Sequence, residues 1–229
     1  MSNPRLSAVE ACVFDAYGTL FDVNAAAQHA ASDLGDKWQP LADIWRQKQL
    51  QYTWLRSLMG AHTDFWAVTG DALDFAMASL DIDDDALRQK LMDLYLKLDA
   101  YEEVKDTLTA LKDRGKRLAI LSNGSEAMLA AAVENAGIGG LLDAVFSVDA
   151  VGIFKPHPSV YKMAVDGLGL PPARMSFQSS NGWDAFASKN YGYQVVWINR
   201  FGQAAERMPA SPDVMLTSLH DLPGVVAGD

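Results

Sequence analysis

Apolar and polar residues alternate along the chain in two different patterns, and the change between them falls near residue 100. After that point, short apolar runs typical of buried strands alternate with segments in which apolar residues recur about every three to four positions, as in amphipathic helices. The expected strands are 117–121, 144–148, 174–178, 194–198 and 214–217, and the expected helices are 104–114, 126–136, 159–168 and 183–191. Repeated strand–helix units of this length predict a parallel sheet with helices on both faces.

The first part of the chain has a different pattern. A strand is expected at 11–14, but no second strand follows soon after it, and the pattern of residues 22–98 is wholly helical, with helices expected at 41–59, 63–80 and 84–98. The sequence therefore predicts an α/β fold: a parallel-sheet core of residues 1–21 and 99–229, and an inserted helical cap domain, 22–98. Trp38, Trp54 and Trp66 in this insertion could belong to its core or to an interface between subunits.

The composition narrows the possible classes of protein. The chain has 229 residues, of which 49% are hydrophobic and 21% charged, as in globular proteins with a substantial core. No apolar run approaches the roughly 18 residues that cross a bilayer, and the net charge of −10 argues against binding to nucleic acid or an anionic membrane. Cys12 is the single cysteine and lies in an apolar run, which indicates a small buried residue. The absence of an intrachain disulfide fits a cytoplasmic protein.

One acidic cluster, 81–85, invites interpretation as a metal site. It lacks the spacing and the glycine of a calcium-binding loop. We therefore interpret it as the solvated start of a helix.

Polar side chains follow four of the expected strands. Asp15 follows the first strand, Ser122-Asn123-Gly124 the second, Lys155-Pro156 the third and 179–184 the fourth. Because ligands bind at the carboxyl ends of the strands in an open parallel sheet, the four groups are expected to meet in one site. A lone Asp-x-x-Gly would merely cap a turn, but with the other three groups nearby Asp15 is a candidate nucleophile whose carboxylate could form an ester.

These motifs resemble the haloacid dehalogenase-like superfamily, and most closely its bacterial (S)-2-haloacid dehalogenases. The similar stretches are DAYGTLFDV at 15–23, WRQKQL at 45–50, YTWLRSLM at 52–59 and SSNGWD at 179–184. The resemblance implies a Rossmann-like core with a helical cap, and a homodimer without a cofactor. It also implies hydrolysis of (S)-2-haloalkanoic acids to (R)-2-hydroxyalkanoic acids with inversion. Its expected ligands are a small anionic 2-haloacid and the released halide.

Tyr17 and Asn181 favour a halide over a phosphate ester as the leaving group. Phosphatases of this superfamily carry a second aspartate two positions after the nucleophile, to protonate the leaving alkoxide, and this chain has Tyr17 there. Halide leaves without a proton, so general acid catalysis adds nothing, and a tyrosine can instead exclude water from the attacking carboxylate. After the fourth strand, Ser179-Ser180-Asn181 leaves Asp184 as the acid of this segment, a poor match for the carboxylate ligands of magnesium.

The second half-reaction needs an activated water. Asp184 is the expected general base, held by Asn181 and Ser179, and its position at a helix start would also favour the helix. Lys155 is expected to keep both carboxylates ionised. We expect Tyr161 to form hydrogen bonds behind these groups, and Thr19 to hold the loop that carries Asp15.

Further residues are expected to bind the substrate. Ser122 and the backbone amides around Asn123 and Gly124 would bind its carboxylate, although such a turn often only caps a helix. The resemblance implies that Arg46 binds halide, with Asn123 and Trp183 completing the cradle; alone, Arg46 would be read as an exposed helical arginine. The remaining expected contacts, most of them around the alkyl group, are Ala16, Tyr17, Gln47, Leu50, Phe65, Asn181 and Trp183.

Three alternatives remain open on the sequence. The nearest is a magnesium-dependent phosphatase of the same fold. The second alternative is a related enzyme that opens a strained ring at C2 or attacks a C–F bond there. A catalytically silent binding protein is the third, although retention of the nucleophile, base and cradle residues argues against it.

Overall fold

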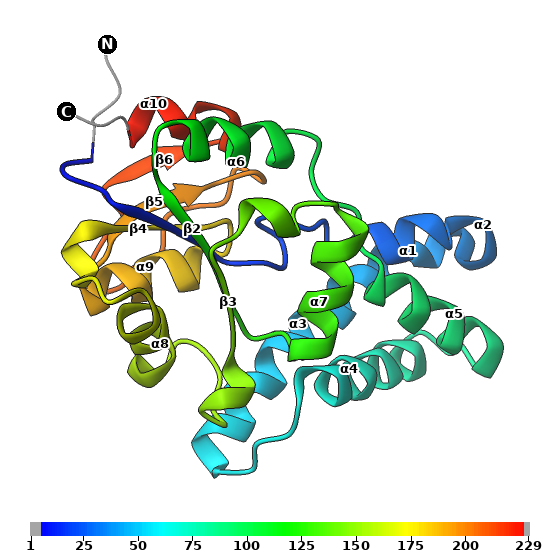
Figure 1. The fold of residues 1–229 in the computed structure, drawn as a ribbon. Helices are drawn as coiled ribbons and strands as arrows, with labels where there is room; N and C mark the ends of the chain where they lie inside the picture. The colour runs from blue at the N-terminus through cyan, green and yellow to red at the C-terminus, as the bar shows by residue number, and fades with distance from the viewer. Residues whose placement is uncertain (1–5, 227–229) are drawn as a thin grey trace.

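The structure, a computed structural model, describes residues 6–226 and has one six-stranded parallel sheet within them, ordered β3-β2-β1-β4-β5-β6 (Figure 1). The strands are β1 (Ala11–Phe14), β2 (Arg117–Ser122), β3 (Ala144–Ser147), β4 (Met175–Ser179), β5 (Gln194–Ile198) and β6 (Val214–Leu216). Each strand begins and ends within about one residue of the limits expected from the apolar pattern. The predicted α/β, Rossmann-like fold is therefore confirmed.

Strand β1 lies at the centre of the sheet and determines where the candidate nucleophile lies. Phe14 pairs with Ile120 of β2 on one side and with Gln178 of β4 on the other. All four residues of β1 are fully buried, including Cys12, and burial raises the pKa of the Cys12 thiol to about 11. The ladder continues one residue further, because the backbone N–H of Asp15 donates to the carbonyl of Gln178 at 2.9 Å. Asp15 is thereby held at the carboxyl edge of the sheet.

Helices cover both faces of the sheet (Figure 1). Helix α6 (Val104–Asp113) and the short α10 (Leu222–Val225) pack together on one face, and α8 (Pro158–Leu168) and α9 (Gly182–Tyr191) lie on the other. Helix α7 (Glu126–Asn135) connects β2 to β3. Short 3₁₀ turns occupy 35–37, 139–141, 148–150, 172–174 and 219–221.

The segment between β1 and α6 is helical, as expected from its pattern. It contains α1 (Ala25–His29), α2 (Ala31–Leu34), α3 (Trp38–Met59), α4 (Phe65–Ser79) and α5 (Asp85–Leu96), which group to one side of the sheet in Figure 1. Helix α3 begins three residues before the expected start at 41, because Pro40 falls in its first turn, where proline removes no hydrogen bond. Trp38 and Trp66 pack against the core, and Trp54 packs against Trp183.

The inserted segment leaves the core and returns to it at one point. The N–H of Asp22 donates to the carbonyl of Asp99 at 2.9 Å, Phe21 and Ala100 form an isolated antiparallel bridge, and the N–H of Tyr101 donates to the carbonyl of Leu20 at 3.0 Å. These paired backbones lie at the boundary expected between core and insertion.

The acidic cluster at 81–85 begins a helix, as expected. The side chain of Asp84 accepts the N–H of Leu87 at 2.9 Å and caps α5, and Asp85 occupies the first turn. Among residues 6–226, no group of three or more His, Cys, Asp or Glu side chains is placed to hold a metal ion. No helix in this same range is long and apolar enough to cross a membrane.

Candidate active site

One lysine lies between two buried carboxylates at the carboxyl edge of the sheet. The ammonium of Lys155, which is 1% exposed, is 3.0 Å from Oδ1 of Asp15 and 2.9 Å from Oδ2 of Asp184. It also lies 4.9 Å from the ring centroid of Phe177. Three segments far apart in the sequence therefore meet in one cluster, as the ends of the strands led us to expect.

The two oxygens of Asp15 have different surroundings. Oδ2 accepts three hydrogen bonds, from Asn181 Nδ2 at 2.8 Å, Thr19 Oγ1 at 3.1 Å and Ser179 Oγ at 3.3 Å. Within the described chain, Oδ1 accepts only the bond from Lys155. Oδ2 is thus held in a fixed direction by neutral donors, whereas Oδ1 keeps lone pairs for another partner.

Thr19 fixes the turn that carries Asp15. Its hydroxyl donates to Asp15 and accepts the backbone N–H of Ser180 at 2.8 Å, so that it connects the turn after β1 to the turn after β4. Its carbonyl accepts a hydrogen bond from Nη2 of Arg200 at 2.9 Å. The sequence did not single out Arg200, which also pairs with Glu103 at 2.6 Å.

Asp184 is fully buried, and its partners differ from those expected. Oδ1 accepts the hydroxyl of Tyr161 at 2.7 Å, and Oδ2 accepts the ammonium of Lys155. The prediction that Asn181 and Ser179 hold Asp184 is wrong, because both donate to Asp15 instead. The reason lies in the geometry: Ser179 ends β4 beside β1, whereas Asp184 lies in the first turn of α9 and contacts Tyr161 of α8.

The charges of this cluster shift the pKa values of its members. Burial, together with the nearby charge of Asp15, raises the pKa of the Asp184 carboxyl, although Lys155 and the Tyr161 hydroxyl act in the opposite direction. Burial alone would lower the pKa of Lys155, but the two carboxylates more than offset it, and the net shift is upward. Lys155 therefore stays charged, and Asp184 is a stronger base than an exposed aspartate.

Arg46 reaches from α3 of the insertion to the core. Its Nη2 lies 3.0 Å from Oδ1 of Asn181 and 3.3 Å from the carbonyl of Tyr17, and its Nη1 lies 2.7 Å from Oε1 of Gln49. The guanidinium is therefore next to Asn181, which itself donates to Asp15. Gln49 is a buried residue that the sequence did not single out.

A cavity of about 560 Å³ adjoins Arg46. Gln47, Leu50, Asn181 and Trp183 also line it, so four of the expected ligand contacts meet Arg46 at one surface. Asn181 connects this cavity to the nucleophile, because it both lines the cavity and donates to Asp15.

Three further residues expected to contact the substrate, Ala16, Tyr17 and Phe65, do not line this cavity. Tyr17 is buried, with its ring centroid 5.7 Å from that of Phe65. Burial raises the pKa of the Tyr17 hydroxyl well above its usual value, and Asp15 adds to the shift. The carbonyl of Ala16 accepts the backbone N–H groups of Leu20 and Phe21, which closes the turn after the nucleophile.

The turn after β2 is organised differently from the simple anion site that was expected. The N–H of Gly124 already donates to Oγ of Ser122 at 3.0 Å, and Oδ1 of Asn123 accepts the backbone N–H of Lys155 at 2.8 Å. The structure thus brings Asn123 to Lys155 and not into a hydrogen bond with Arg46. A Cβ on Gly124 would lie 2.6 Å from the Tyr17 ring, so this turn must approach the nucleophile turn closely.

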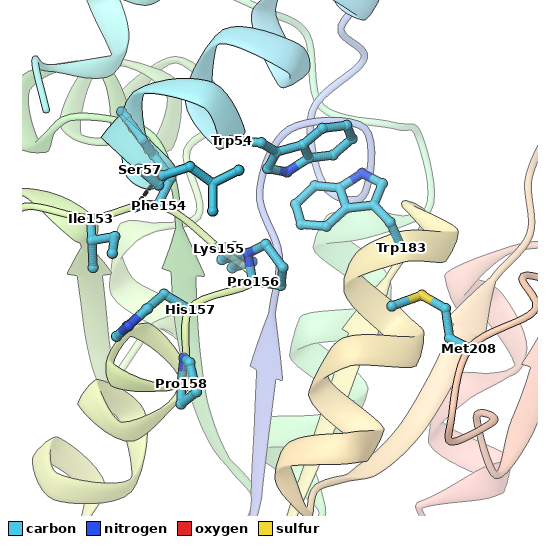
Figure 2. Close-up of a pocket in the computed structure, with 11 residues that line it drawn as sticks. Trp54, Ser57, Ile153, Phe154, Lys155, Pro156, His157, Pro158, Trp183 and Met208 are labelled. Atoms are coloured by element: carbon cyan, nitrogen blue, oxygen red, sulfur yellow. Dashed lines mark hydrogen bonds between the residues drawn. The ribbon is translucent and has the colours of Figure 1, made fainter. Parts of the chain in front are cut away.

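A second cavity, of about 450 Å³, lies on the other side of Trp183 and has almost entirely apolar walls (Figure 2). Its residues include Trp54 and Phe154, and the backbone N–H of Phe154 donates to Oγ of Ser57 at 3.2 Å. The indoles of Trp54 and Trp183 meet edge to face with centroids 5.4 Å apart. Trp183 lines both cavities.

Known proteins resemble this chain along nearly its whole length. The family model of the haloacid dehalogenase-like hydrolases matches residues 9–192. The chain is 44% identical to (S)-2-haloacid dehalogenase 1 of Pseudomonas sp. (strain CBS-3), over 94% of this chain and 95% of that one.

Solved structures of dehalogenases also resemble this chain. A crystal structure of a dehalogenase has 40% identity and a TM-score of 0.95, with 98% of this chain and all of that one covered. L-2-haloacid dehalogenase from Xanthobacter autotrophicus, solved with chloropropionic acid covalently bound, has 37% identity and a TM-score of 0.88, over 94% of this chain and 97% of that one.

Replacement of Lys155 by methionine tests the electrostatics of the cluster. Without the cation two buried carboxylates face each other, and we expect a loss of about 3–5 kcal/mol in the free energy of unfolding near neutral pH. The pKa of Asp184 would rise further, so the folded state would bind more protons than the unfolded state, and stability would fall as pH rises. Urea unfolding of the variant and the wild type at pH 5 and pH 8 measures this change in the free energy of unfolding.

Lys162→Met is the matched control, because Lys162 pairs with Asp166 on the surface. We expect its stability to stay close to that of the wild type at both pH values. A Lys155→Met variant whose deficit is the same at both pH values would contradict the electrostatic account.

Proposed function

Since the chain belongs to the haloacid dehalogenase-like hydrolase family, we propose that the cluster around Asp15 is the catalytic site of an (S)-2-haloacid dehalogenase. The protein is a hydrolase that acts on carbon–halide bonds: it converts (S)-2-haloalkanoic acids to (R)-2-hydroxyalkanoic acids through an aspartyl ester. The observation that carries the assignment of roles is the unequal surroundings of the two Asp15 oxygens.

In the first step, Oδ1 of Asp15 attacks C2 of the substrate while the carbon–halogen bond breaks. Attack opposite the leaving halide inverts C2 and forms an ester between C2 and Oδ1. The halide departs toward Arg46, whose guanidinium stabilises the developing charge in a partly closed cavity. No proton is needed, because halide is a very weak base.

In the second step, water attacks Cγ of the Asp15 ester and gives a proton to Asp184. The negative charge that develops on Oδ2 is stabilised by the three donors already in place, Asn181, Thr19 and Ser179. The Cγ–Oδ1 bond then breaks, Oδ1 leaves as the hydroxyl oxygen of the product, and the proton returns to it. Asp15 is left as a carboxylic acid that holds one oxygen and the second proton of the water, and release of this proton to solvent regenerates the carboxylate.

Lys155 supports a reaction without a metal. Its ammonium contacts both carboxylates, Asp15 and Asp184, and supplies the positive charge that a divalent cation would supply in a phosphatase of this fold. Tyr17 stands where such a phosphatase has its proton donor. The phosphatase alternative is therefore disfavoured.

The remaining predicted contacts bind the substrate. Ser122, with the turn at Asn123, would bind the carboxylate, since this turn meets Tyr17 and Lys155. Ala16 would be a further contact, and the pocket around the alkyl group would consist of Tyr17, Gln47, Leu50, Phe65 and Trp183.

The insertion, 22–98, is a cap domain in this proposal, because it carries Arg46 to the core and leaves the core at one point. We also propose that the protein works in the cytoplasm, in keeping with its single buried cysteine. A homodimer is supported by exposed apolar side chains on the insertion, of which Leu58 is 85% and Met59 68% exposed.

Halide release from (S)- and (R)-2-chloropropionate, with and without EDTA, tests the function. We expect the wild type to release chloride from the S form only, with no effect of the chelator. In Asp15→Asn the rate should fall by at least about a thousandfold, because the nucleophile is lost. Asp106→Asn, on the exposed face of α6, is the matched control. Chelator-sensitive turnover, or full activity in Asp15→Asn after mass spectrometry excludes deamidation, would contradict the proposal.

The role of Asp184 as the base predicts a shift in the pH profile of Tyr161→Phe. The Tyr161 hydroxyl lowers the pKa of Asp184, so that its removal should raise this pKa. The base must be ionised, and the acidic limb of kcat should move to higher pH by roughly half to one unit. Tyr191→Phe, whose ring packs 5.6 Å from that of Tyr161, is the control. Identical limbs in both variants would argue against Asp184 as the base.

The proposed dimer predicts that Leu58→Asp yields monomers, because a charge would be buried in the interface. Sedimentation equilibrium should give twice the mass of the 24.9 kDa chain for the wild type and the single-chain mass for the variant. Met215→Asp, at an exposed position of β6, should leave the dimer intact. A monomeric wild type would refute the homodimer.

A further inference from the structure

A buried polar network in the insertion holds the side chain of Arg46 from behind. Gln49 is 1% exposed and lies one helical turn after Arg46 on α3. Its Oε1 accepts Nη1 of Arg46 at 2.7 Å, and its Nε2 lies 2.8 Å from Oγ1 of Thr69 and 2.9 Å from the hydroxyl of Tyr95. Thr69 and Tyr95 are also buried. From this geometry we infer that Gln49 is a positioning residue that aims Arg46 at the departing halide.

The network allows one orientation of the Gln49 amide. Thr69 gives its hydroxyl hydrogen to the carbonyl of Phe65 at 2.7 Å, so its oxygen can only accept from Gln49. The amide nitrogen must therefore face Thr69, and the amide oxygen must face Arg46. The carbonyl of Thr69 is in turn held by the indole N–H of Trp45 at 2.9 Å. The Tyr95 hydroxyl also lies 3.2 Å from Gln49 Oε1. The amide oxygen that meets Arg46 cannot turn away without leaving the Thr69 oxygen and the Arg46 N–H unpaired.

The same network fixes the wall beside the nucleophile. The ring of Tyr95 stacks on that of Tyr17 with centroids 5.8 Å apart and an interplanar angle of 16°. Tyr17 also accepts Nη2 of Arg46 through its carbonyl. Gln49 thus sets the position of the guanidinium relative to both the cap and the nucleophile turn.

Arg46 keeps capacity for a ligand in this arrangement. Gln49, Asn181 and the Tyr17 carbonyl engage three of the five N–H groups of the guanidinium within the described chain. Arg46 lines the cavity, and its other two N–H groups remain available to a ligand there. A guanidinium held on two sides needs little reorganisation when charge develops on the leaving group, and this is what makes a donor effective in a transition state.

This inference rests on the proposed role of Arg46 in binding halide, and Gln49→Leu tests it. The leucine keeps the volume but removes the acceptor for Nη1. In single-turnover measurements, we expect chloride release from (S)-2-chloropropionate to slow by about tenfold or more. Bromide release from (S)-2-bromopropionate should slow less, because bromide is the better leaving group and depends less on stabilisation by Arg46. The inhibition constant of added chloride should rise as well, with a smaller change in KM than in kcat.

Two further variants keep the test decisive. Gln51→Leu changes the same residue type on the same helix, at an exposed position that contacts Lys48, and should leave all these values at the wild-type level. Should Gln49→Leu fail to fold, Thr69→Val removes the acceptor of the Gln49 amide. This variant should also slow chloride release more than bromide release and raise the inhibition constant of chloride. Thr69→Ser, which keeps the hydroxyl, should have wild-type values of both.

The outcomes separate this inference from the proposed function. A folded Gln49→Leu enzyme with wild-type chloride inhibition and an unchanged bromide-to-chloride ratio would overturn the inference while the dehalogenase function stands. A uniform loss with both halides, without a change in chloride inhibition, would show a merely structural role and overturn it too. If the wild type released no halide from either substrate, the proposed function itself would fall, and the inference with it.

Discussion

The ammonium of Lys155 between Asp15 and Asp184 is the interaction on which the rest of the site depends. Two carboxylates this deeply buried cannot both stay ionised without a cation, because the desolvation of each charge must be offset by a partner. With Lys155 present, one carboxylate can act as a nucleophile and the other as a base at the same pH. The fold supplies the lysine from the segment after β3, and the turn after β2 holds its backbone through Asn123.

The second constraint is that the two oxygens of Asp15 have different hydrogen-bond donors. Three neutral donors converge on Oδ2 before any substrate binds, so the stabilisation of the charge that develops during ester hydrolysis is already built into the free protein. In the proposed reaction Asn181 would serve both half-reactions, because it donates to Asp15 and accepts from Arg46. Arg46, Asn181 and Asp15 are therefore parts of one hydrogen-bonded unit.

Much of this arrangement could be predicted from the sequence, and the exceptions have physical causes. The strands were recognisable because a central parallel strand such as β1 is apolar throughout, and the residues after each strand must meet at one edge. That reasoning locates Asp15, Lys155 and Asp184 together. It does not show the direction of a side chain, and for this reason the partners of Ser179 and Asn181 were misassigned.

Gln49 was missed for a different reason. A polar residue on an amphipathic helix is ordinarily exposed, and only the packing of α4 against α3, with Tyr95 of α5 beside it, shows that this one is buried. Arg200 was missed because its contact is with a backbone carbonyl, which leaves no pattern in the sequence. Contacts between segments that are far apart in the chain need the folded structure.

The paired backbones at Asp22 and Asp99 give the molecule a modular character. Because the chain leaves and re-enters the sheet at one place, the strand order is independent of the length and content of the intervening segment. The ester-forming groups all belong to the sheet and its turns, whereas Arg46 and the residues that hold it belong to the intervening segment. Evolution could exchange that segment to suit another leaving group and retain the residues of the sheet that surround Asp15.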